Sequence, residues 1–197
     1  MRVAVVIPVK SFTMAKGRLS ETLTPTERED LARTCAESVV RAAHPLPVYV
    51  ACSDADVVEW ATHLGASIVH CPTPGLDNAV STARAHLRDD GFDHVIVSHA
   101  DLPLAHRLDH VARPNVVTMV ADRHRDGTNV LSFPLDSTFH TAYGPGSLDN
   151  HIQIAIQCHL AYEVIQDESL ELDLDTADDL EELHTRNNTS HTQRNPR

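Results

Sequence analysis

Short apolar runs rich in β-branched residues alternate along this chain with segments whose apolar residues recur at helical spacing. The runs predict strands over residues 3–7, 48–52, 67–70, 94–98, 116–120, 130–133 and 162–166. The segments between them predict helices over residues 26–43, 55–64, 78–88, 105–112, 148–160 and 176–184. Strands and helices that alternate with short joins form parallel βαβ units. We therefore predict an α/β fold built on one doubly wound, mostly parallel sheet.

The chain has 197 residues, of which 42% are hydrophobic and 22% are charged. A chain of this length and composition can bury a full hydrophobic core, and nothing in it requires a second domain. We predict a single domain over residues 1–184. Residues 185–197 are polar and are predicted to form a disordered tail.

Charge and cysteine usage exclude several classes of protein. The formal net charge of −12 argues against a nucleic-acid or anionic-membrane surface, because both need a basic footprint. The first strand begins at Val3 with no leader before it, and no apolar run approaches membrane-spanning length, so we predict a cytoplasmic protein. Four cysteines without a CxxC pair are typical of reduced core residues.

Most of the fourteen histidines are predicted to be solvated. His106 and His110 have helical spacing but no third ligand nearby, so no zinc site is expected.

Asp101 follows the apolar run 94–98, which has the pattern of a buried strand. Pro103 prevents a helix from beginning before it, so Asp101 is expected just beyond the carboxyl end of that strand. Ligands of open α/β sheets bind at this edge, and a carboxylate there can hold a hard divalent cation. The alternative is that Asp101 caps a helix that begins near Ala105.

The segment from Pro8 to Pro25 is too long for a simple connection, and long ordered loops are often functional. It contains Lys10 and Lys16, the only lysines of the chain, together with Arg18. Ammonium groups suit phosphate oxygens, so these side chains and the loop amides could hold a triphosphate. The alternative is a loop of solvated charges. Neither a P-loop nor a GxGxxG motif is present.

Three helix starts carry possible caps. Thr26 and Glu29 have the spacing of a capping box. Asp77 and Asn78 precede a helix whose free amides could bind a polar or anionic group, although both could be plain N-caps. The glycine-rich loop 143–147 ends at Ser147, which is predicted to be an N-cap beside free amides, forming a small-anion site. A tight turn with nothing bound is the alternative there.

Residues 170–175 alternate strictly between leucine and an acidic residue. In an extended segment the leucines would pack inward, while Asp173 and Asp175 would share the other face. Neighbouring carboxylates repel unless a cation lies beside them. The fold could bring Asp101 to the same edge and so complete a set of oxygen ligands for magnesium. The alternative is a solvated edge strand in which Asp175 caps the helix from Thr176.

Five motifs in this order resemble those of a known family. They are VIPVKSFTMAKGRLS, HADLPL, DGTN, YGPGSLDNH and LDLDT. The chain resembles the guanylyltransferases of deazaflavin-coenzyme biosynthesis, which act on phosphoenolpyruvate or 2-phospho-L-lactate, and the resemblance extends to about His184. It implies an α/β fold of the nucleotide-diphospho-sugar transferase type. It also implies transfer of GMP from GTP to a phosphorylated three-carbon acid, with release of pyrophosphate.

The resemblance also implies roles for individual residues. The phospho-acid would be held by Thr128, Gly144 and Ser147. Magnesium would be bound by Asp101, Asp173 and Asp175. The GTP phosphates would meet Lys10, Lys16 and Arg18, which with Asp101 form the implied catalytic set, and Asn78 would lie near the nucleoside.

This chemistry needs positioning and charge neutralisation far more than a protein nucleophile. The expected partners are therefore GTP and the phospho-acid, with no nucleic acid or membrane, and whether the chain forms a homodimer is left open. The arginine-rich, lysine-poor composition is typical of a GC-rich bacterial source and favours phosphoenolpyruvate. Two alternatives remain: a nucleotidyltransferase of the same fold acting on a sugar phosphate or molybdopterin, and a non-catalytic nucleotide-binding protein.

Overall fold

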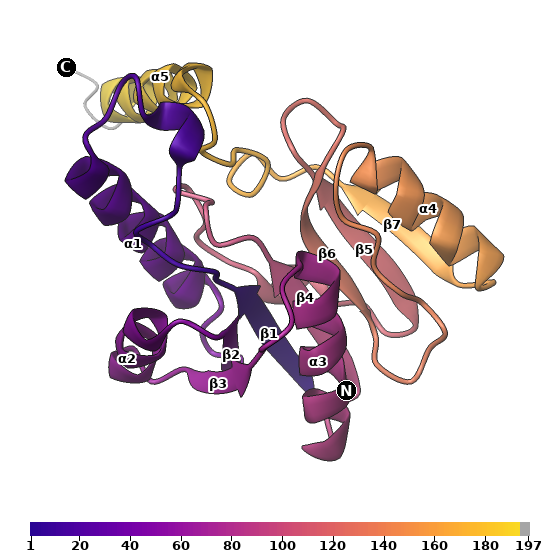
Figure 1. Cartoon of the computed structure of the whole chain (residues 1–197). Helices are drawn as coiled ribbons and strands as arrows, with labels where there is room; N and C mark the ends of the chain where they lie inside the picture. Colours follow the sequence, from indigo (N-terminus) through magenta and orange to yellow (C-terminus); the bar gives the residue numbers. More distant parts are fainter. Residues whose placement is uncertain (194–197) are drawn as a thin grey trace.

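A seven-stranded sheet organises the computed structural model, which describes residues 1–193 (Figure 1). The strands are β1 Val3–Pro8, β2 Val48–Cys52, β3 Ser67–His70, β4 His94–Ser98, β5 Val116–Ala121, β6 Thr128–Pro134 and β7 Ala161–Ile165. Their order is β3-β2-β1-β4-β6-β5-β7. β6 runs antiparallel to β4 and β5, and the other neighbouring pairs are parallel. The predicted α/β fold with a mostly parallel sheet is confirmed.

Helices cover both faces of this sheet (Figure 1). They are α1 Pro25–Ala42, α2 Ala55–His63, α3 Leu76–Asp89, α4 Ser147–Gln157 and α5 Ala177–Gln193. Successive residues of β1 point to opposite faces, so Val6 packs in the core beneath α3 and α4 while Val5 packs beneath α1 and α2. A strand buried on both faces is apolar throughout, which explains the continuous run at the start of the chain.

The helix predicted over residues 105–112 is wrong. That stretch holds a single 3-10 turn, η2 Asp109–Val111, between Pro103 and Pro114. Proline disfavours helix in the residue before it and cannot continue a helix interior, so little room remains for a longer one. His106 and His110 therefore do not share a helix face, and His110 Nε2 lies 3.0 Å from Asp167 Oδ2.

Two predicted caps are also wrong. In α1 the capping box is formed by Thr24 and Glu27: Thr24 Oγ1 accepts from Glu27 N at 3.3 Å, and Glu27 Oε2 accepts from Thr24 N at 2.8 Å. Pro25 explains the shift, because proline favours the first helical position and places the cap one residue before it. The N-cap of α3 is Gly75, which has φ 111° and, as a glycine, has no side chain to form a capping hydrogen bond.

Residues 170–175 alternate as predicted but do not join the sheet. Leu170, Leu172 and Leu174 are fully buried, whereas the acidic residues between them are partly exposed. Long-range hydrogen bonds replace a strand ladder. Asn129 Nδ2 donates to the carbonyls of residues 170 and 171 at 3.1 and 3.0 Å, and Leu174 N donates to Asp101 O at 3.1 Å.

α5 continues to Gln193, so the prediction of a disordered tail is wrong for residues 185–193. Arg186 joins this part of α5 to the segment that precedes the helix, because it donates to Glu168 O at 2.7 Å and to Glu171 Oε1 at 3.1 Å. Residues 194–197, the rest of the predicted tail, lie outside the described part of the chain. No helix in residues 1–193 is long and apolar enough to cross a membrane.

Candidate functional site

Three segments far apart in the sequence meet beyond the carboxyl ends of β1 and β4. Lys16 comes from the long loop after β1, Asp101 follows β4, and Asp175 precedes α5. Lys16 Nζ lies 2.9 Å from Asp101 Oδ2 and 3.6 Å from Asp175 Oδ1. We call Lys16, Asp101, Asp173 and Asp175 the charged cluster. The predicted convergence of Asp101 with the acidic segment is therefore what the structure shows.

Lys16 is held firmly in this cluster. Its backbone has φ 57° and ψ 35°, a left-handed conformation that costs a non-glycine residue roughly 1–2 kcal/mol. Its side chain is only 4% exposed. Burial disfavours the ammonium, but the charge and hydrogen bond of Asp101 and the charge of Asp175 outweigh it and raise the pKa of Lys16. Burial also opposes ionisation of Asp101, yet Lys16 above all keeps the pKa of Asp101 below its usual value. The pair is therefore ionised at neutral pH.

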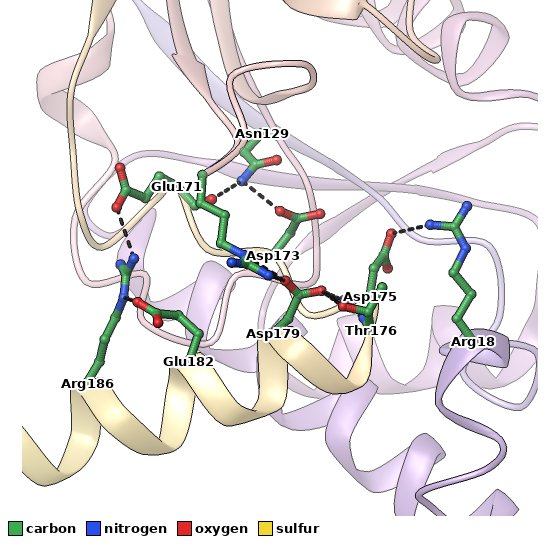
Figure 2. Close-up of polar contacts among 10 residues, drawn as sticks. Arg18, Asn129, Glu171, Asp173, Asp175, Thr176, Asp179, Glu182 and Arg186 are labelled. Carbon is green, nitrogen blue, oxygen red and sulfur yellow. Dashed lines mark hydrogen bonds and ion pairs between the residues drawn. The ribbon is translucent and has the colours of Figure 1, made fainter.

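Asp173 has the opposite electrostatic environment. Burial and the charge of Asp101, with a smaller contribution from Asp175, raise the pKa of Asp173. The hydrogen bond from Asn129 Nδ2 at 3.4 Å is long and only partly offsets this (Figure 2). The carboxylates thus repel one another, as the alternating pattern of residues 170–175 predicts.

The donors of the charged cluster fit Mg²⁺ in part. Asp101 Oδ1 is buried and has no hydrogen-bond partner within residues 1–193. An unpartnered buried carboxylate oxygen is suited to a hard cation. In the same part of the chain, however, no group of three or more His, Cys, Asp or Glu side chains is arranged to hold a metal ion. Mg²⁺ usually takes only one or two carboxylates, with waters and substrate phosphates completing its shell.

The alternative roles suggested for these carboxylates are not observed. No helix begins near Ala105 for Asp101 to cap. Asp179, rather than Asp175, satisfies the amides at the start of α5, accepting from Asp175 N at 3.0 Å and from Thr176 N at 2.7 Å (Figure 2). The Asp175 carboxylate instead faces Arg18, whose Nη1 lies 3.9 Å from Asp175 Oδ2.

Two neighbouring cavities open at this edge of the sheet and share a wall formed by Pro8, Val9, Lys10 and Leu76. The first, of about 360 Å³, is lined by Lys16, His99, Asp101 and Asp175 among others. The second, of about 370 Å³, is enclosed mainly by the ends of β2 and β3 and by residues 71–76. Each cavity has the volume of a small-molecule site. Lys10 is exposed on the wall between them.

Neither Asp77 nor Asn78 caps α3, and each instead bonds a neighbouring loop. Asn78 Nδ2 donates to Pro74 O at 2.7 Å and so fixes the loop that closes the second cavity. A Cβ at Gly75 would lie 3.3 Å from Asn78 Nδ2, which leaves little space for a side chain at a residue whose φ already favours glycine. Asp77 Oδ1 accepts from Tyr143 N at 3.1 Å and ties α3 to the glycine-rich loop.

The glycine-rich loop differs from the predicted anion site. Gly146, with φ 69°, is the N-cap of α4, and Ser147 is its first helical residue. The amides of Gly146 and Leu148 donate to Asp126 at 3.1 and 3.0 Å, and the Ser147 amide donates to Gly144 O at 3.1 Å. These amides are therefore already bonded within the protein. Gly144 has φ 128°, which requires glycine.

Thr128, Ser147 and His151 form what we call the neutral network. Thr128 N donates to Ser147 Oγ at 3.0 Å, and Thr128 Oγ1 lies 3.0 Å from His151 Nδ1. His151 Nε2 accepts from Ala142 N at 3.0 Å, and burial lowers the pKa of His151 to about 4. The neutral ring must then carry its hydrogen on Nδ1 and donate it to Thr128. The hydroxyl hydrogen of Thr128 is left free for another acceptor.

Sequence reasoning missed three residues here. His151 follows Ser147 by four residues, so the two share a face of α4, and this spacing could have identified it. His99 stands two residues before Asp101 and lines the first cavity. The Tyr143 ring lies 5.6 Å from that of His99 and 4.9 Å from that of His151. Burial, helped by the charge of Asp77, raises the pKa of Tyr143, so the phenol stays protonated.

The chain is similar in sequence to known proteins over most of its length. Residues 3–195 match the family described as guanylyl transferase, CofC-like. The chain is 35% identical to 2-phospho-L-lactate guanylyltransferase of Methanothermobacter thermautotrophicus, over 93% of this chain and 84% of the relative. It is 30% identical to phosphoenolpyruvate guanylyltransferase of Sphaerobacter thermophilus, over 93% of each chain.

Solved structures share the fold. A protein of Desulfovibrio desulfuricans described as a nucleotide-diphospho-sugar transferase superposes with a TM-score of 0.75 at 18% identity, over 94% of this chain and 87% of that one. The CMP:2-keto-3-deoxy-manno-octonic acid synthetase in complex with CTP superposes with a TM-score of 0.57 at 11% identity, over 96% of this chain and 100% of that one. The fold is therefore of the nucleotide-diphospho-sugar transferase type, as the sequence motifs imply.

Proposed function

The chain belongs to the CofC-like guanylyl transferase family, and from this premise we propose that it transfers GMP from GTP to the phosphate of a phosphorylated three-carbon acid, releasing pyrophosphate, in deazaflavin-coenzyme biosynthesis. The observation that carries the proposal is the meeting of Lys16, Asp101 and Asp175 in the first of two adjoining cavities. This edge of an open α/β sheet is where nucleotides bind.

GTP would occupy both cavities. Its phosphates belong in the first cavity, because Lys10 and Lys16 both line it and Arg18 lies beside Asp175 at its rim. Its nucleoside belongs in the second cavity, whose wall is largely apolar and is fixed by Asn78. Asn78 thus supports the nucleoside pocket by shaping the loop, a role that agrees with its implied place near the nucleoside.

Magnesium is the cofactor we propose for the charged cluster, with Asp101 and Asp173 as its first ligands and Asp175 beside them. The unpartnered Oδ1 of Asp101 and the raised pKa of Asp173 support this choice. A bound Mg²⁺ would neutralise phosphate charge and orient the triphosphate. Lys16 would supply the same kind of charge from the protein, since its ammonium already lies against Asp101.

The reaction is an in-line displacement at the α-phosphorus of GTP. A phosphate oxygen of the acid attacks, the bond to the pyrophosphate oxygen breaks, and pyrophosphate leaves. This transfer requires no covalent protein intermediate, since positioning and charge stabilisation supply most of the acceleration. Lys10, Lys16 and Arg18 would offset the charge that develops on the leaving group.

The acid would lie toward the neutral network. The resemblance assigns Thr128 to the acid; its side chain is fully buried in the free protein, and within residues 1–193 its hydroxyl hydrogen has no acceptor once His151 donates to it. Ser147 holds Thr128 through its amide, and Gly144 gives the loop its turn. Phosphoenolpyruvate is the favoured acid and a cytoplasmic location is a further expectation, while the oligomeric state is left open. The four free cysteines are consistent with a reducing compartment.

A screen of purified chain against pairs of substrates tests this function. GTP or CTP is mixed with phosphoenolpyruvate, 2-phospho-L-lactate or 3-phosphoglycerate, and with a sugar phosphate, and pyrophosphate release is measured with Mg²⁺ or with EDTA. We expect release only with GTP, one of the acids and Mg²⁺. Release with a sugar phosphate would indicate the alternative transferase, and nucleotide binding without release from any pair would indicate a binding protein.

A further inference from the structure

Two buried polar atoms next to each other have no hydrogen-bond partner within residues 1–193. They are His99 Nε2 and the hydroxyl oxygen of Tyr143. A buried donor or acceptor without a partner costs stability, so such atoms are rare in folded proteins and need an explanation. Their rings lie only 5.6 Å apart, so one ligand group could satisfy both.

These two side chains stand between the first cavity and the neutral network. His99 lines that cavity together with Lys16 and Asp101. The Tyr143 ring meets the His151 ring edge to face at 4.9 Å, and His151 in turn bonds Thr128. The backbone of Tyr143 is anchored by Asp77, so its position is set by α3 as well as by α4. His99 therefore borders the first cavity, and Tyr143 lies between His99 and the neutral network.

The chemistry of this corner suits an anion held by hydrogen-bond donors. The buried phenol of Tyr143 stays protonated, the imidazole of His99 carries a hydrogen on at least one nitrogen, and the hydroxyl hydrogen of Thr128 is free. The lysines of the cavity belong to the loop after β1, where the phosphates would lie. A carboxylate accepts several hydrogen bonds at once and fits these donors.

We propose that His99 and Tyr143 bind the carboxylate of the acceptor acid and so set the specificity of the enzyme for a phospho-acid; this rests on the proposed function. The phosphate of the acid then faces Lys16 and the charged cluster, and its carboxylate faces the ring pair. A phosphorylated three-carbon alcohol, which has no carboxylate, is therefore not an acceptor.

Tyr143→Phe tests the proposal because it removes one oxygen and keeps the ring. We expect the KM for the acid to rise about tenfold to a hundredfold, as for a lost hydrogen bond to a charged group, while the KM for GTP changes less than about twofold. The melting temperature should stay the same or rise, since the hydroxyl has no hydrogen-bond partner in the described part of the chain. His99→Phe should raise the KM for the acid in the same way.

Two other tyrosines provide matched controls. The Tyr49 hydroxyl donates to Asp90 Oδ2 at 2.9 Å, so Tyr49→Phe should lower the melting temperature and leave both KM values unchanged. Tyr162 is 44% exposed, so Tyr162→Phe should change neither quantity.

The proposal is overturned if Tyr143→Phe and His99→Phe both keep the wild-type KM for the acid, or if Tyr143→Phe lowers the melting temperature as Tyr49→Phe does. In either case wild-type transfer to the acid still supports the function. If the wild-type protein transfers GMP to no acid at all, the proposed function itself fails.

Discussion

The charged cluster and the neutral network lie at the same edge of the sheet but are built differently. The charged cluster joins three loop segments, contains carboxylates that repel, and leaves Asp101 Oδ1 without a hydrogen-bond partner among residues 1–193. The neutral network joins β6 to α4 and consists of uncharged groups, and Ser147 and His151 are almost fully buried. An unbalanced cluster can change its contacts when charged ligands arrive, whereas a bonded network keeps one geometry. The comparison indicates that the charged cluster supplies the charges of the site, while the neutral network holds its residues in a fixed geometry.

Among the substitutions, Asp101→Asn in the charged cluster should have the largest effect on turnover. Loss of the charge leaves the buried Lys16 ammonium with Asp175 alone and removes the proposed metal ligand. We expect turnover to fall at least about a thousandfold and the melting temperature to drop, measured by pyrophosphate release and by thermal unfolding. Asp109→Asn, in an exposed pair with Arg107, is the control and should change neither. Near-normal turnover of Asp101→Asn would remove Asp101 from the site.

Low pH should lower the stability of the folded protein through His151 of the neutral network. The pKa of His151 is about 4 in the folded protein because of burial, against 6.5 for the free side chain. Between these values the unfolded chain binds the proton and the folded one does not, so stability is complete above about pH 6.5 and falls as the pH drops toward 4. The expected loss is up to about 3 kcal/mol. His94, bonded to Ser132 and also lowered to about 4 by burial, adds a similar contribution. Urea unfolding at pH 7, 5.5 and 4.5 measures the slope, and a flat profile would contradict it.

His151→Phe should disrupt the network without changing any charge at neutral pH. It leaves Ala142 N without its acceptor and removes the donor to Thr128. We expect about 2 kcal/mol of lost stability in urea unfolding at pH 7.5. The variant should also lose the part of the pH slope due to His151 and keep the part due to His94. His63→Phe, at an exposed position on α2, should leave the stability within about 0.5 kcal/mol.

Asp173→Asn gives the smallest expected change in stability without metal, and the sign of that change sharpens the contrast. Without magnesium it should raise stability by less than about 1 kcal/mol, because the repulsion from Asp101 and Asp175 disappears. Asp175→Asn should instead lower stability slightly, since Asp175 is paired with Lys16 and Arg18. Thermal unfolding in EDTA compares the two variants. A loss of stability in Asp173→Asn would show that the Asp173 carboxylate makes net favourable contacts in the charged cluster, rather than being repelled by Asp101 and Asp175.

The strands of the fold and the edge that carries the site could be predicted from sequence because buried strands leave continuous apolar runs. The leucine face of residues 170–175 was predictable for the same reason. The position of residues 170–175 against the rest of the protein was not predictable, because it depends on Asn129, about forty residues away. The side-chain amide of Asn129 donates to the carbonyls of residues 170 and 171. The helix expected over residues 105–112 failed because two prolines outweigh its apolar spacing.

The site was predictable where a charge has to be neutralised and less so where neutral groups bond one another. Asp101 and Lys16 stand out in the sequence because charges at a strand end or in a long loop need partners. Ser147 and Thr128 were expected to face a ligand, but in the structure they first bond each other. Local patterns do not report such pairs, because the two residues are nineteen positions apart. The roles of Lys10, Gly144 and Thr128 toward substrates stay predictions.

β6 runs against both of its neighbours, and this separates most of the proposed nucleotide side from most of the proposed acceptor side. Residues 1–101 carry the proposed nucleotide side together with His99, and residues 116–165 carry the rest of the proposed acceptor side. The sheet joins the two through the β4–β6 ladder. A reversed strand begins where its neighbours end, so the turn before it can change in length without moving β1 or β4. We therefore expect acceptor preference to evolve mainly by substitution of residues 116–165, and a chimera that carries that segment from a relative and keeps His99 to acquire the acid preference of the donor while it keeps GTP.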